Sequence, residues 1–88
     1  MKIKEGFLLR EVAKTFIVIS VGDSELDFNG VITLNEVGGL IWKEIEDGKK
    51  EDEIINKIIS EYNVDKDTAK NDFADFINQL KEHNIIEE

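Results

Sequence analysis

The stretch GVITLNEVGGLIW, residues 30–42, decides the fold because it changes from strand to helix at one residue. Its first part, Val31 to Leu34, is an uncharged run of aliphatic and β-branched residues that favours a strand. Asn35 follows, and its side-chain oxygen can accept an orphan backbone N–H of a first helical turn. Apolar residues then recur at helical spacing from Val37 to Ile45, so we expect a helix over about Glu36 to Glu46.

Two strands precede this stretch. Residues 7–12 (FLLREV) and 15–21 (TFIVISV) are rich in β-branched and aromatic residues, and Ala13-Lys14 between them can close a hairpin. The third strand lies within residues 25–34, where Asn29-Gly30 favours either a turn or a bulge. We interpret the segment as one bulged strand ending in VITL. The sequence thus predicts a three-stranded antiparallel sheet.

Two more helices follow. Residues 51–62 place isoleucines on one face and begin with three acidic residues, which suit the positive end of a helix dipole. The third helix is capped by Asp65 or Asp67, and Asn84 suits the left-handed position after it. Its apolar stripe consists of Ala69, Phe73, Phe76, Ile77 and Leu80. The order of strands and helices predicts an α+β fold, and nothing divides residues 1–88, so we expect a single domain.

The composition excludes several classes of function. A chain of 88 residues can build one core but is short for an enzyme with a buried cleft. It has no cysteine and one histidine, His83, so we expect no metal site and no cofactor. No apolar run approaches the roughly 20 residues that cross a bilayer, and the N-terminus lacks a signal-peptide pattern. We therefore expect a cytoplasmic protein that does not contact a membrane.

The charge argues against nucleic acid as a partner. Twenty acidic and eleven basic side chains give a formal charge of −9. The imbalance is concentrated in the helical half, because residues 51–88 alone carry −7. A phosphate backbone would be repelled there, where a DNA-reading helix would need lysine and arginine.

The sequence offers no catalytic set. Its many carboxylates lie on expected solvated helix faces, and no nucleophile, base and orienting group can be combined, so we predict no catalytic residues. Trp42 is expected in or beside the core, with an exposed binding aromatic as the alternative. Gly38 and Gly39 each cost about 1 kcal/mol inside a helix relative to alanine. We expect another helix to approach them closely, with ligand contact as the alternative.

The third strand has the properties of an open sheet edge. It carries neither charge nor proline, the usual devices against edge pairing, so an extended peptide could add itself there. The third helix is a candidate second wall, with Phe73 and Phe76 in its stripe and the polar residues Asp72, Asp75 and Gln79 along one margin. The alternative is that both phenylalanines fill the core. A second copy of the chain could also pair at the edge, which would make a homodimer.

The segments FLLRE, FIVISVG, NGVITLNEVGGLIW, DGKKEDEIINKII and YNVDKDTAKNDFADFINQLKEHNII, in this order, resemble PqqD-like proteins. These are leader-peptide recognition elements of pathways for ribosomally synthesised, post-translationally modified peptides. The match covers essentially the whole chain, and its most specific parts are the strand-to-helix junction and the third-helix run from Asp72 to Leu80. The connection over residues 22–29 is longer than in the shortest members, which leaves the register of the third strand open.

The resemblance implies a winged-helix-like fold and a binding chaperone without catalytic activity. Such a protein binds the leader of a precursor peptide as an added strand and presents it to a modifying enzyme, often a radical S-adenosylmethionine enzyme. Carried to this sequence, the resemblance implies the peptide-binding residues Val31, Ile32, Thr33, Leu34, Asp72, Phe76, Gln79 and Leu80. Three alternatives stay open: a docking module of a larger biosynthetic enzyme, a winged-helix DNA-binding protein and a small enzyme.

Overall fold

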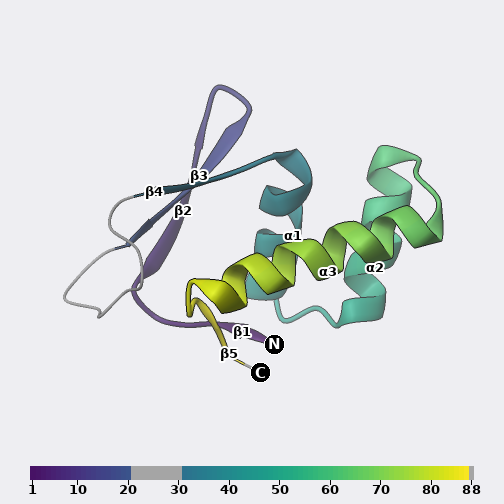
Figure 1. The fold of residues 1–88 in the computed structure, drawn as a ribbon. Helices are drawn as coiled ribbons and strands as arrows, with labels where there is room; N and C mark the ends of the chain where they lie inside the picture. The colour runs from purple at the N-terminus through teal and green to yellow at the C-terminus, as the bar shows by residue number, and fades with distance from the viewer. Residues whose placement is uncertain (21–30, 88) are drawn as a thin grey trace.

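The computed structural model describes residues 1–20 and 31–87 (Figure 1). In chain order its elements are β1 (Lys2–Ile3), β2 (Phe7–Val12), β3 (Thr15–Ser20), β4 (Val31–Leu34), α1 (Glu36–Glu46), α2 (Glu51–Tyr62), α3 (Lys66–Glu82) and β5 (Ile86–Glu87). A three-stranded sheet followed by three helices confirms the predicted α+β fold. The sequence did not predict the short strands β1 and β5.

The main sheet has the order β2-β3-β4, with both pairs antiparallel. Ala13 and Lys14 have positive φ angles of 48° and 68°, as a two-residue hairpin turn of the primed type requires. β4 pairs with β3 on one side and ends the sheet on the other. The bulge predicted at Asn29-Gly30 lies outside the described residues.

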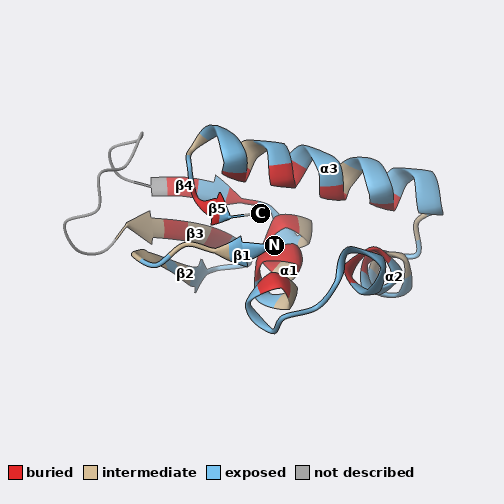
Figure 2. Cartoon of the chain, turned by 90° about the horizontal axis from the view of Figure 1, so that it is seen from below, coloured by how far each residue is buried: buried red, intermediate tan, exposed pale blue. Residues whose placement is uncertain are grey.

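One face of this sheet is buried beneath the helices. Alternate residues of β3 and β4 point into the core, among them Phe16, Val18, Ile32 and Leu34. α1 packs directly on the sheet, and α2 and α3 pack on α1 and on each other. Figure 2 shows the buried residues of α3 on the side that faces the rest of the molecule. The three helices and the sheet therefore share one hydrophobic core.

β1 and β5 join the two ends of the described chain. They form a two-stranded antiparallel sheet in which Ile3 lies opposite Ile86, and the two ends lie close together in Figure 1. The Lys4 backbone N–H donates to the Ile85 carbonyl oxygen at 2.8 Å. Strands of two residues show no hydrophobic period, so the sequence gives no signal for them.

Side-chain caps begin two of the helices. The Gly38 backbone N–H donates to Asn35 Oδ1 at 2.8 Å, which confirms Asn35 as the cap of α1. The Thr68 backbone N–H donates to Asp65 Oδ1 at 2.7 Å, so Asp65 caps α3 and Asp67 lies in its first turn. Asn84 adopts the expected left-handed conformation with φ 58°.

The glycine pair of α1 has two different neighbours. A Cβ on Gly39 would overlap Cδ2 of the Phe16 ring, so the glycine lets the helix approach a strand. A Cβ on Gly38 would lie 3.2 Å from Cβ of Leu34 and 3.2 Å from Cε1 of Phe76 on α3. The prediction that another helix approaches the pair is confirmed for Gly38 and is wrong for Gly39, where the neighbour is a strand side chain. Trp42 is fully buried, as the core interpretation predicts.

We expect Gly39→Ala to destabilise the protein by up to about 2 kcal/mol. Alanine adds about 1 kcal/mol of helix propensity, but displacing the Phe16 ring costs about 1–3 kcal/mol. Urea unfolding measures the difference. In a Phe16→Leu background the same substitution should cost less, because the ring atoms that it meets are gone. An equal cost in both backgrounds would contradict the contact.

The cap of α3 should make stability depend on acid. The hydrogen bond from the Thr68 backbone N–H lowers the pKa of Asp65, and a side-chain hydrogen bond from the same residue adds to the effect. A carboxyl with a lowered folded pKa stabilises the protein above its unfolded pKa and loses that contribution as the pH falls through the folded value. The wild type should therefore lose stability relative to Asp65→Asn below about pH 4. Urea unfolding against pH measures this, with Asp67→Asn as the charge-matched control; a parallel loss in both variants would contradict it.

Candidate functional site

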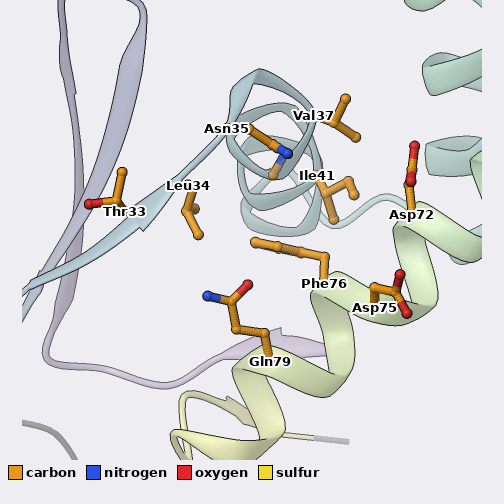
Figure 3. Close-up of a pocket in the computed structure, with 10 residues that line it drawn as sticks. Thr33, Leu34, Asn35, Val37, Ile41, Asp72, Asp75, Phe76 and Gln79 are labelled. Carbon is orange, nitrogen blue, oxygen red and sulfur yellow. The ribbon is translucent and has the colours of Figure 1, made fainter.

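A groove of about 270 Å³ lies between the end of β4, the first turns of α1 and the middle of α3 (Figure 3). Among the described residues, its lining combines apolar side chains with polar ones and includes no lysine, arginine or histidine. The lining residues are Thr33, Leu34, Asn35, Val37, Gly38, Ile41, Asp72, Asp75, Phe76 and Gln79.

The groove exists because α3 packs against α1, α2 and β5 and makes at most marginal contact with β4. Gly38 determines how deep the groove is, because without a side chain it lets the Phe76 ring lie against α1. Figure 3 shows this ring extending from α3 toward Leu34 and α1. Leu34 and Phe76 thus form the apolar floor of the groove between β4 and α3.

One face of α3 supplies the far wall. Asp72, Asp75, Phe76 and Gln79 are spaced i, i+3, i+4 and i+7, which places them along one side of a helix. In Figure 3 Gln79 lies on the β4 side of the groove and Asp72 on the side of Val37. Asp75 is exposed, whereas Asp72 and Gln79 are partly buried. The wall is therefore mainly polar, and its apolar part is the edge of the largely buried Phe76 ring.

The outer edge of β4 presents backbone groups beside the groove. A two-residue hairpin closes on a hydrogen-bonded pair, here Val12 with Thr15, and such pairs recur at every second residue of an antiparallel ladder. Following the alternation through β3, the backbone groups of Ile32 and Leu34 point toward β3. The N–H and C=O groups of Val31 and Thr33 consequently point away from the sheet. No described residue pairs with this edge.

The structure places the predicted peptide-binding residues in two environments. Five of them line the groove: Thr33, Leu34, Asp72, Phe76 and Gln79. Four apolar side chains of the set belong to the core, because Leu34 is 3% exposed, Phe76 6%, Ile32 7% and Leu80 0%. Leu34 and Phe76 therefore border the groove with only a small part of their surface, and Val31 contributes its backbone to the edge. Phe73 also lies in the core and does not line the groove. The alternative that both phenylalanines fill the core is thus confirmed, and Phe76 in addition borders the groove.

Residues of α1 line the groove although the sequence analysis did not assign them to it. Val37 is a partly buried apolar residue of the lining, Ile41 lies fully buried behind it, and Asn35 and Gly38 lie where α1 begins. The sequence shows the apolar period of this helix but not that its first turns face α3. The sequence predicts Asn35 as a helix cap and Gly38 as a position of close packing. It does not indicate that either residue lines a groove.

Neither a metal centre nor a membrane span is found among the described residues. Within residues 1–20 and 31–87, no three or more histidine, cysteine, aspartate or glutamate residues are grouped to hold a metal ion. None of the helices in the described part of the chain is both long and apolar enough to span a membrane.

Two solved structures have a similar fold. One, described as TbiB1 in complex with the TbiA(beta) leader peptide, is 28% identical with a TM-score of 0.81, and the match covers 99% of this chain and 95% of that chain. The other, described as lasso peptide synthetase B1 complexed with the leader peptide, is 21% identical with a TM-score of 0.73, covering 92% and 89%. At this lower identity the likeness concerns the fold alone. No curated protein matches the sequence.

A family comparison covers every element that forms the groove. The family described as coenzyme PQQ synthesis protein D (PqqD) matches residues 16–86, which include β4, the three helices and β3 from its second residue on. The match confirms the resemblance drawn from the sequence. The chain belongs to the PqqD family.

Proposed function

We propose that this chain is a peptide-binding chaperone that captures the leader segment of a ribosomally synthesised precursor peptide and presents it to a separate modifying enzyme. One observation carries the proposal: the groove lies directly beside a strand edge that no residue of the described chain pairs with. Support comes from the fold shared with TbiB1, whose structure contains a leader peptide. The cytoplasm, where ribosomes make such precursors, is the compartment that this function requires.

The leader adds to the sheet as a further strand next to β4. The outward N–H and C=O groups of Val31 and Thr33 supply backbone hydrogen bonds, which give affinity for any extended chain. Alternate leader side chains then point toward α3 and meet Leu34 and Phe76 on the groove floor. Backbone pairing holds the peptide, and the groove discriminates among side chains.

The proposed role is binding without catalysis. The part of the groove lining that the structure describes contains two carboxylates, two amides, one threonine and apolar groups, and no histidine, lysine or cysteine. This set offers neither an activated nucleophile nor a base held by an orienting partner. The chemistry then belongs to the modifying enzyme, and a radical S-adenosylmethionine enzyme is the class that the family resemblance suggests.

A titration tests this function. Synthetic leader segments from precursor-like genes beside this one are added to ¹⁵N-labelled protein. Amide shifts should cluster on β4 and along α3 from Asp72 to Gln79. Shifts confined to β2, on the opposite edge of the sheet, would reject the site. Binding of the modifying enzyme without any leader binding would favour a docking module instead.

Thr33→Pro should weaken leader binding by at least about tenfold, because it removes one outward hydrogen-bond donor and places a ring at the edge. The bond ladder to β3 does not use this N–H, so the fold should be retained. Thr33→Val is the matched control, since it keeps the N–H, and should bind within about twofold of the wild type. Equal binding by both variants, measured by calorimetry, would argue against strand addition.

Gly38→Ala should narrow the groove. The new methyl group contacts the Phe76 ring and the Leu34 side chain closely, so the ring has to shift away from α1. We expect leader affinity to fall roughly fivefold, while added helix propensity offsets the cost in stability. Asn71→Ala, which changes an exposed residue of α3 outside the groove lining, should leave affinity unchanged. An unchanged affinity for Gly38→Ala would show that the ring does not shape the binding surface.

The open edge also favours pairing with a second copy of the chain, which would form a homodimer and compete with the leader. Light scattering at increasing protein concentration, with and without peptide, shows whether a dimer forms and whether the leader displaces it. A dimer that persists at saturating peptide uses another surface.

A further inference from the structure

We propose that the groove selects leader peptides by charge and takes a segment in which a lysine or arginine lies two positions from an apolar residue. This inference rests on the proposed function and names the class of peptide that the site accepts. The apolar residue lies on Phe76, and the cationic residue lies against Asp72 and Asp75.

The groove differs in charge from other hollows of the surface. Its ionisable lining residues are Asp72 and Asp75, both negative. Three other hollows on the described part of the protein each combine acidic with basic side chains, for example Asp52 with Lys66 and Lys70. The single sign is therefore a local property of this groove and not a general result of the acidic composition.

The two carboxylates of the groove, Asp72 and Asp75, have no bonding partner in the described part of the chain. Neither Asp72 nor Asp75 forms an ion pair or a side-chain hydrogen bond within residues 1–20 and 31–87. By contrast Asp65, on the same helix, caps the first turn. Two carboxylates beside an apolar floor, with no structural partner in the described chain, suit a cation that arrives with the ligand.

The beginning of α1 does not reverse this preference. A helix N-terminus attracts anions, and the first turn of α1 borders the groove. Here the Asn35 side chain already accepts the Gly38 N–H, and Glu36 adds a negative charge to the first turn. The cap and this charge offset the positive end of the dipole, so the lining remains attractive to cations.

The spacing of the wall matches that of an added strand. Asp72 and Phe76 are four residues apart, so they are separated by about 6 Å along the helix axis. Side chains on one face of a strand recur every two residues, at about 6.6 Å. A cationic residue opposite Asp72 and an apolar residue on Phe76 are thus two positions apart in the leader, and Asp75 lies between them along the helix.

A selection experiment tests the inference. A messenger-RNA-displayed library of random twelve-residue peptides is selected on the immobilised full chain and, in parallel, on the Asp72→Asn/Asp75→Asn double variant. Enriched peptides should carry lysine or arginine two positions from an aliphatic or aromatic residue in the wild-type selection. That spacing should disappear on the double variant. The double variant Glu46→Gln/Glu82→Gln, at exposed residues outside the groove lining, removes two negative charges elsewhere and is the charge-matched control.

The best wild-type peptide is then measured individually. Replacing its lysine by norleucine should weaken binding to the wild type about three- to tenfold and leave binding to the double variant unchanged. Added salt should reduce the difference, because partly exposed pairs are screened.

The failures of the two proposals are distinguishable. Enriched peptides that lose affinity to Thr33→Pro but show no lysine or arginine at the expected spacing would overturn charge selection and leave strand addition standing. A cationic preference that persists equally on the double variant would also overturn it, because general attraction to an acidic protein would then be the cause. If no peptide is enriched, or binding is insensitive to Thr33→Pro, the proposed function fails and the inference fails with it.

Discussion

The rest of the structure depends on the close packing of two phenylalanine rings, Phe16 and Phe76, against the glycine pair of α1. Gly39 lets the helix lie against the Phe16 ring, which fixes α1 to the sheet. Gly38 lets Phe76 of α3 lie against the same helix one residue earlier. α1 therefore holds the sheet on one side and α3 on the other, at separations that leave the groove between β4 and α3.

Local physics made most of the fold predictable. The bounds of α1 and α2 follow from an apolar period bounded by capping and turn residues, and Asn35 fulfils the role that its residue type indicates. The hairpin at Ala13-Lys14 is predictable in the same way, because two β-rich runs are separated by two residues. Features that depend on neighbouring residues alone, such as helix caps and short turns, can be predicted from the sequence.

The remaining features depend on contacts between distant parts of the chain. The cost of glycine in a helix predicts a close neighbour at Gly39, but not that this neighbour is a strand phenylalanine. Periodicity puts Phe76 and Leu80 in one stripe, although Phe76 reaches the groove and Leu80 is fully buried. The share of α1 in the groove, through Val37 and Ile41, depends on how three helices are arranged, which no local pattern records.

We infer above all that the outer edge of β4 is open in the free protein and is completed by a peptide. Amide hydrogen exchange measured residue by residue tests it most directly. In the free protein the Thr33 amide should exchange much faster than the amides of Ile32 and Leu34, whose N–H groups point toward β3. A bound leader should slow exchange at Thr33. If Thr33 is as protected as its neighbours before any peptide is added, the edge is already covered and the account is wrong.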